Sequence, residues 1–88
     1  MEYIITFINT NHAIKAEQGL LQKNINVGVL PLPSQISAGC GISLRVGLEL
    51  IKPALAALAD MNIDGIRLYT RINENGHFLY TEVKDNNH

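Results

Sequence analysis

Hydrophobic residues along the chain gather in seven short segments separated by polar stretches. Five of these segments are apolar runs or alternating patterns of strand length, rich in β-branched and aromatic residues, and they predict strands. The other two repeat apolar residues at helical spacing, which predicts amphipathic helices. The predicted strands cover residues 3–8, 25–30, 41–47, 66–72 and 77–83, and the predicted helices cover residues 12–23 and 48–61.

Residues that favour turns and helix ends lie between these segments. Residues 9–11 (Asn-Thr-Asn) offer N-caps for the first helix, and Asn24 tolerates the left-handed conformation that ends helices. Pro53 is accommodated only in a first helical turn, so the second helix either begins there or bends there. Asn75-Gly76 is the strongest hairpin signal in the chain and joins the last two strands. Residues 84–88 are predicted to be a polar tail.

The predicted order of elements is β-α-β-β-α-β with one added strand. This order favours an α+β ferredoxin-like plait, in which an antiparallel sheet carries two helices on one face, here extended by a C-terminal hairpin strand. Residues 1–83 are expected to form one domain, because nothing in the sequence indicates a linker or a repeat. In a plait the third strand pairs with the first. A right-handed crossover then brings the end of the first strand, the start of the first helix and the loop before the third strand to one end of the sheet.

Composition and charge narrow the classes of function. Of the 88 residues, 47% are hydrophobic and 17% are charged, which is typical of a folded globular chain. The formal net charge of −1 and the lack of a basic cluster argue against nucleic acid or a membrane surface as a partner. No apolar run approaches the ~20 residues that span a bilayer, and the N-terminus lacks a signal-peptide pattern, so a cytoplasmic protein is expected.

The most unusual chemistry lies in the loop between the second and third strands, which holds Cys40, the only cysteine. Pro31 and Pro33 restrict this loop, and Gly39 and Gly41 on either side of the thiol permit backbone angles that other residues avoid. Hairpin loops usually contain about two to five residues, and this loop is longer. Loops of such length often have a function. A single cysteine is inert core filling, a nucleophile or half of an intermolecular disulfide, and these features favour a functional thiol.

The expected topology brings Cys40 to the point where the loop enters the third strand, beside the start of the first helix near Thr10. Free amides and the helix dipole at such a position stabilise a thiolate, so no basic side chain is required. The sulfur is therefore expected to emerge into water next to the helix N-terminus.

Four polar residues around this loop have competing interpretations. Glu17 falls within the apolar stripe of the first helix, where it either accepts hydrogen bonds from the cysteine loop or extends to the helix edge. Ser37 is favoured as a turn-former that bonds local backbone rather than as a reactant. His12 could shuttle a proton to the thiol, although a histidine in a first helical turn is more often simply exposed. Arg45 is expected on the face of its strand opposite to Cys40.

No cofactor and no metal are predicted. His77 and His88 have no partners at metal-ligand spacing, and one cysteine with scattered histidines is a weak zinc pattern. The sequence also lacks a Gly-rich phosphate loop, a Ser/His/Asp arrangement and a nucleophile elbow.

The sheet face away from the helices is predicted to be uncovered. It is expected to carry Tyr3 and Ile5 or their neighbours, while the last two strands expose Tyr69, Phe78 and Tyr80. Aromatic residues on an uncovered face usually meet a partner, so a homodimer is expected.

Several short motifs together resemble a known family. The pattern comprises Phe7 and Thr10, Ala13 and Glu17, Pro31-x-Pro33, Ile36-Ser37, and Cys40-Gly41 followed by Leu44-Arg45. It resembles the putative Se/S carrier protein-like family of small bacterial proteins over residues 3–69. The hairpin of residues 71–83 lies beyond this match, and Asn9 stands where a small residue is expected.

The resemblance implies a protein that holds a persulfide or perselenide on Cys40, loaded by a donor such as a cysteine desulfurase and unloaded on a biosynthetic acceptor. Such a protein is a carrier with a reactive cysteine rather than a complete enzyme. It needs an accessible thiolate and donors for the anionic outer atom, which Gly39 and Gly41 allow the backbone to supply. Two alternatives stay open: a non-catalytic ferredoxin-like ligand-binding or regulatory module, and a structural dimer whose thiols pair.

Overall fold

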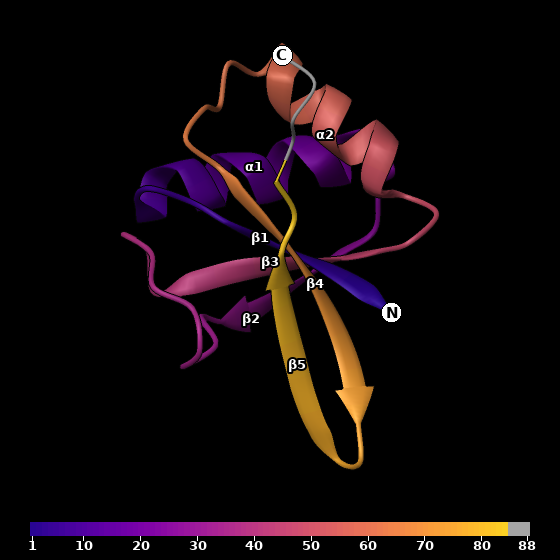
Figure 1. Ribbon diagram of the computed structural model, residues 1–88. Coiled ribbons are helices and arrows are strands. Elements are labelled where there is room, and N and C mark those ends of the chain that lie inside the picture. The colour runs from indigo at the N-terminus through magenta and orange to yellow at the C-terminus, as the bar shows by residue number, and fades with distance from the viewer. Residues whose placement is uncertain (85–88) are drawn as a thin grey trace.

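The computed structural model describes residues 1–84 and contains five strands and two helices in the predicted order (Figure 1). The observed ends differ from the predicted ends by at most three residues. The elements are β1 (Glu2–Thr6), α1 (Thr10–Gln22), β2 (Val27–Pro31), β3 (Ile42–Gly47), α2 (Ile51–Asp60), β4 (Arg67–Glu74) and β5 (His77–Glu82).

The strands form one antiparallel sheet in the order β2-β3-β1-β4-β5. The predicted α+β class and the predicted pairing of β1 with β3 are confirmed. Both helices contact each other and cover the same face of the sheet, which we call the helix face (Figure 1). The opposite side of the sheet is called the open face.

The helix ends follow from local side-chain chemistry. Asn9 is the N-cap of α1, and its side-chain oxygen accepts a hydrogen bond of 2.8 Å from the His12 amide. Helix α1 therefore begins two residues earlier than predicted, because the first of the three polar residues is the cap. Asn24 has a φ of 61°, the left-handed conformation predicted for the end of this helix. Pro53 lies in the first turn of α2, where its missing N–H is tolerated.

The turn between β4 and β5 is the predicted two-residue hairpin. Asn75 and Gly76 have φ values of 54° and 83°, as a type I′ turn requires, and Glu74 pairs with His77 across the turn. Figure 1 shows that this hairpin projects beyond the part of the sheet that the helices cover.

Strand alternation directs Tyr3, Ile5 and Phe7 of the β1 segment toward the helices. Of the two alternatives expected for the open face, Tyr3 and Ile5 are therefore excluded, and their neighbour Ile4 lies there. The main core, on the helix face, contains Ile5, Phe7, Ala13, Ala16, Leu20, Ile25, Cys40, Leu44, Val46, Ile51, Ala54, Ala57, Leu58 and Ile63.

A second, smaller core lies on the open face. Buried Ile4 of β1 and Tyr69 of β4 are directly paired, and Ile36 from the loop between β2 and β3 packs against them. The expected exposure of Tyr69 is therefore wrong, because this loop covers it. Phe78 is exposed as predicted, whereas Tyr80 is half-buried against this second core, and the homodimer stays a prediction.

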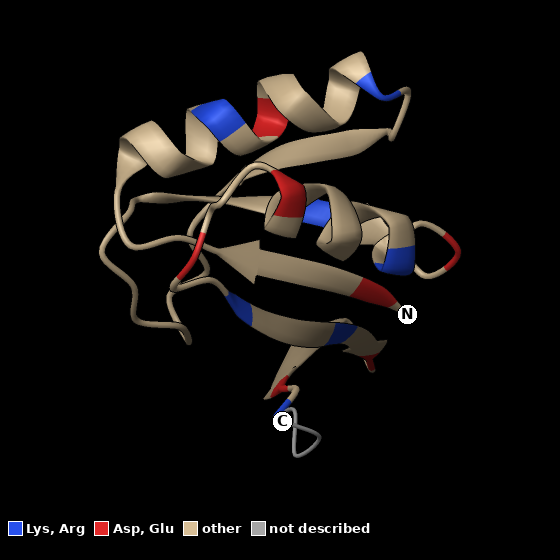
Figure 2. Ribbon diagram, turned by 90° about the horizontal axis from the view of Figure 1, so that it is seen from above, with Lys and Arg blue, Asp and Glu red and all other residues tan. Residues whose placement is uncertain are grey.

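Charged residues are dispersed over the molecule. Figure 2 shows Lys and Arg interspersed with Asp and Glu on both helices and on the sheet. Neither of the two helices described is long and apolar enough to cross a membrane.

Candidate functional site

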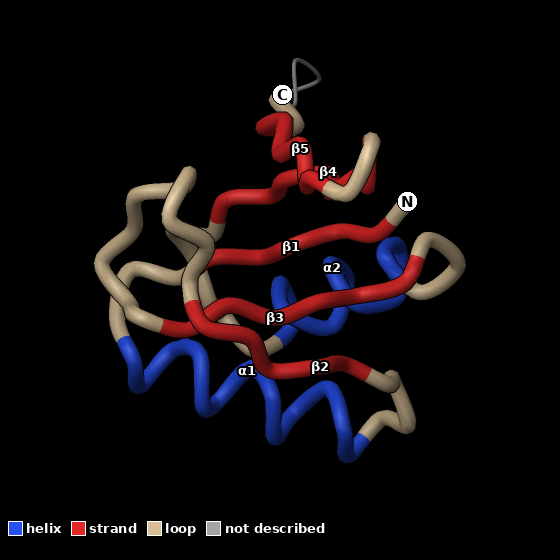
Figure 3. Tube along the Cα trace, turned by 90° about the horizontal axis from the view of Figure 1, so that it is seen from below, coloured by secondary structure: helices blue, strands red, loops and turns tan. Residues whose placement is uncertain are grey.

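Cys40 lies at the end of the sheet where α1 begins, which is the position that the topology predicts. Its Sγ lies 3.7 Å from the Oγ1 of Thr10, the first residue of α1. The backbone N–H of Ile42 donates to the same sulfur at 3.5 Å. Figure 3 shows the loop before β3 and the start of α1 at the same end of the sheet. The sulfur therefore has one hydroxyl and one amide within hydrogen-bond reach.

The sulfur is buried, so the expectation that it emerges into water is wrong. Cys40 is only 2% exposed and belongs to the main core with Phe7, Ala13 and Leu44. The reason is alternation: Ile42 points to the helix face, and Cys40, two residues earlier, follows the same direction. The first turn of α1 then lies against it.

Residues 32–41, which join β2 to β3, form the cysteine loop. The Leu32 N–H donates to the Gly41 carbonyl at 2.9 Å, which closes the loop at its base. The Ile36 N–H donates to the Pro33 carbonyl at 3.0 Å, which forms a tight turn within it. The loop thus has two internal backbone hydrogen bonds among the residues that the structure describes.

The two glycines beside Cys40 do not adopt the left-handed backbone angles for which they are expected. Neither adopts a positive φ; the glycines that do are Gly65 and Gly76. Gly39 instead allows a close approach, because a Cβ built there would lie 2.1 Å from the carbonyl oxygen of Ile8. A Cβ on Gly41 would meet nothing within 4 Å. The loop is therefore pressed at Gly39 against the segment that follows β1, whereas the side of Gly41 where a Cβ would lie is open.

Ser37 lies on the outside of the cysteine loop. It is exposed, and its hydroxyl makes no hydrogen bond with any residue between 1 and 84, so the predicted local turn bond is not formed. Ser37 and Gly39 line a surface pocket of about 340 Å³ together with Thr6 and Arg67. Cys40 does not line this pocket.

The structure does not bring His12 to the thiol. Thr10 and His12 are two residues apart, which separates their side chains by about 200° around the helix. His12 shares its flank of α1 with Lys15, whose Nζ donates to the Met61 carbonyl at 3.3 Å. Its Nδ1 is buried and has no hydrogen-bond partner within residues 1–84.

Glu17 is half-buried on α1. Its carboxylate accepts no hydrogen bond from the cysteine loop in the part of the chain that the structure describes. Of the residues expected near the thiol, the structure thus brings Thr10 to the sulfur, whereas Ser37, His12 and Glu17 do not reach it.

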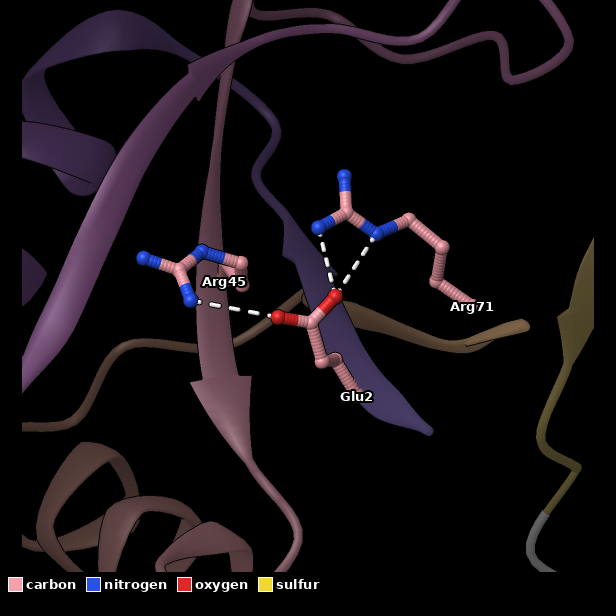
Figure 4. Close-up of polar contacts among 3 residues, drawn as sticks. All are labelled: Glu2, Arg45 and Arg71. Carbon is pink, nitrogen blue, oxygen red and sulfur yellow. Dashed lines mark hydrogen bonds and ion pairs between the residues drawn. The ribbon is translucent and has the colours of Figure 1, made fainter. Parts of the chain in front are cut away.

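Arg45 lies on the open face, opposite to Cys40, as predicted. It donates to Glu2 at 3.1 Å, and Arg71 donates to the other oxygen of Glu2 through Nε at 3.0 Å (Figure 4). The guanidinium of Arg71 also lies 4.2 Å from the centre of the Phe78 ring. This row of side chains ties β3, β1, β4 and β5 together on the open face.

The carboxyl of Glu2 has an altered acidity. Hydrogen bonds from Arg71, and then from Arg45, outweigh the opposing effect of burial and lower the pKa of Glu2 below its ordinary value of 4.5. Because the pKa is lower in the folded state, the stabilisation is present above the unfolded-state value. It is lost as the pH falls through the folded-state pKa.

Glu2→Gln should therefore lower the free energy of unfolding by about 1 kcal/mol near neutral pH, since the exposed part of the network is screened by solvent. The difference between variant and wild type should shrink as the pH falls below the pKa of Glu2. Urea unfolding across this pH range measures the effect. Glu74→Gln is the control, because Glu74 is exposed and has no ion pair within residues 1–84. A difference that does not change with pH would contradict the assignment to the Glu2 carboxylate.

Ile36 is the residue whose structural role sequence reasoning missed. It is 7% exposed although its neighbours Gln35 and Ser37 are exposed. The available signal was an isolated large apolar residue inside a polar loop. The hydrophobic pattern alone does not identify the residues that Ile36 packs against, because Ile4 and Tyr69 are distant from it in the sequence.

A family model described as "Putative Se/S carrier protein-like" matches residues 2–70. No curated protein and no solved structure gives a significant match. Within residues 1–84, no group of three or more His, Cys, Asp and Glu side chains is placed to hold a metal ion.

Proposed function

Because the chain belongs to the putative Se/S carrier protein-like family, we propose that it carries sulfur or selenium as a persulfide or perselenide on Cys40. The observation that carries the proposal is the position of the sulfur, 3.7 Å from Thr10 Oγ1 at the start of α1. Cys40 is the only cysteine of the chain, so no other thiol is available for this role.

Two polar groups near Cys40 can donate hydrogen bonds to an anionic sulfur. The Ile42 N–H already donates to it, and the Thr10 hydroxyl can rotate to donate as well once the thiol has lost its proton. The positive end of the α1 dipole adds to this stabilisation without a basic side chain. A thiolate is the form that attacks a persulfide.

The transfer step balances without an external oxidant. The Cys40 thiolate attacks the outer sulfur of a donor persulfide, R–S–SH, and forms a new S–S bond. The S–S bond of the donor breaks, and R–S⁻ leaves with the electron pair, while the outer sulfur keeps its proton. A donor protein such as a cysteine desulfurase would supply the persulfide, and an acceptor thiolate or other nucleophile would remove the outer sulfur by the same exchange. Selenium follows the same scheme.

The absence of a second cysteine in the chain supports a carrier. A loaded Cys40 persulfide cannot be converted to an internal disulfide, so the cargo is kept until an external nucleophile arrives.

We assign this activity to the cytoplasm, where a lone thiol stays reduced between transfers. The strand order β2-β3-β1-β4 with both helices on one face supports a ferredoxin-like plait extended by β5.

Incubation with a cysteine desulfurase and cysteine should add the mass of one sulfur atom to the intact protein. Cys40→Ser should abolish the gain, and a thiol reductant should reverse it in the wild type. Intact-protein mass spectrometry measures all three. Thr81→Ser is a matched control for handling, because Thr81 is exposed on β5, far from the loop in the sequence.

The burial of Cys40 favours a second candidate, a ferredoxin-like module in which the thiol only fills the core. In that case no sulfur is added by any donor, and Cys40→Ser leaves the protein's binding properties intact. A mass gain that persists in Cys40→Ser would contradict the carrier proposal.

A further inference from the structure

The cysteine loop passes around the end of the sheet and has one buried residue on each side of it. Within residues 34–41, Ile36 and Cys40 are the two buried residues, 7% and 2% exposed. Ile36 packs on the open face against Ile4 and Tyr69, whereas Cys40 packs in the main core on the helix face. The segment 36–40 of the loop is therefore anchored at both of its ends, by Ile36 on the open face and by Cys40 on the helix face.

Ile36 is the only buried residue of segment 34–41 on the open face, and Leu32 at the start of the loop is half-buried against the same cluster. The residues around it, Ser34, Gln35 and Ser37, are exposed and bury no side chain. Its contacts with Ile4 and Tyr69 are apolar, so they can separate and re-form without breaking a hydrogen bond to the sheet. The Ile36 N–H bonds to Pro33 inside the loop, and this bond can move with the loop.

The backbone that follows Cys40 also permits movement of the segment 36–40. Gly41 has open space on the side where a Cβ would lie, while its carbonyl accepts the Leu32 N–H and fixes the base of the loop. Residues 36–40 lie outside β2 and β3, so their displacement leaves every strand pair of the sheet and the Leu32–Gly41 hydrogen bond in place. The sulfur can then reach solvent through a local opening rather than through global unfolding.

We propose that Ile36 is a positioning residue that holds Cys40 in the closed site, and that release of Ile36 from the open face exposes the sulfur. This inference rests on the proposed function, because a carrier must present its sulfur to a donor and an acceptor. A protein partner that binds the open face and competes with Ile36 for Ile4 and Tyr69 would open the site. Cargo on Cys40 would be shielded from solvent between such encounters.

The test is the rate at which iodoacetamide alkylates Cys40 under native conditions, followed by mass spectrometry at increasing urea. A local opening gives a rate that is nearly independent of urea at low concentration, whereas global unfolding gives a rate that rises steeply. Ile36→Ala should raise the urea-independent rate by about 10- to 100-fold, since it removes three buried carbons. Ile36→Val removes one, and its increase should be about fourfold or less.

Two controls separate the role of Ile36 from general destabilisation. Gln35→Ala changes an exposed neighbour in the same loop and should leave the rate unchanged. Leu20→Ala weakens the main core, so it should accelerate only the urea-dependent part. An Ile36→Ala rate equal to that of wild type, or one that rises only with urea, would overturn the inference. Alkylation needs no cargo, so a protein that opens through Ile36 but gains no sulfur would refute the carrier proposal alone.

Discussion

Gly39→Ala should destabilise the protein by about 1–3 kcal/mol and raise the alkylation rate of Cys40. A Cβ at this position would lie 2.1 Å from the Ile8 carbonyl oxygen, and a backbone atom cannot rotate away as a side chain can. The cysteine loop must therefore move away from the end of β1. Because Cys40 is the next residue, its sulfur moves with the loop. Urea unfolding and the alkylation assay measure the two effects.

Gly41→Ala is the matched control, since it makes the same change on the other side of Cys40. The added methyl meets no atom within 4 Å, and Gly41 does not have a positive φ. We expect an alkylation rate close to that of wild type and a stability that is unchanged or higher by about 0.4–1 kcal/mol, because alanine restricts the unfolded chain. Equal effects of the two substitutions would show that the close approach of Gly39 to Ile8 does not contribute to the position of the loop.

Leu20→Ala should lower the free energy of unfolding by about 2–5 kcal/mol. Leu20 is fully buried in the main core, so the truncation removes apolar contacts and leaves a cavity between α1 and the sheet. A protein of this size has a total stability of only about 5–15 kcal/mol, so this single change removes a large part of it. Urea denaturation followed by circular dichroism measures the change.

Leu21→Ala is an internal control for the same chemistry. Leu21 is the next residue of α1 and is 47% exposed. Both substitutions change helix propensity by the same amount, so the difference between them isolates burial. Leu21→Ala should lie within about 0.5 kcal/mol of wild type. Comparable losses for the two variants would mean that α1 does not pack on the sheet through Leu20.

The fold could be predicted from the sequence because its signals are local. The period of apolar residues separates strands from helices, and Asn24 and Asn75-Gly76 fix turns by their tolerance of positive φ. The right-handed crossover then brings Cys40 to the start of α1, where Thr10 lies 3.7 Å from the sulfur. Each of these steps needs only neighbouring residues or a general rule of topology.

The burial of Cys40 and the roles of its neighbours could not be predicted in this way. Exposure depends on contacts between distant segments, such as the first turn of α1 over the sulfur and Ile36 over Ile4. The glycine at position 39 was expected for its backbone freedom, whereas its function is to leave room for the Ile8 carbonyl. The expected topology also brings His12 near Cys40, but the rotation of the helix separates its side chain from that of Thr10, which faces the sulfur.

The hairpin beyond the family match changes where the sheet ends. The match stops at residue 70, and Arg71, which binds Glu2, is the next residue. In a chain that stopped there, the outer backbone of β4 would be unpaired beside Tyr69, next to the cysteine loop. Here β5 occupies that position and pairs with β4 from Tyr69 to Glu74. The hydrogen-bonding groups that could recruit a foreign strand are thereby shifted one strand outward, away from the thiol.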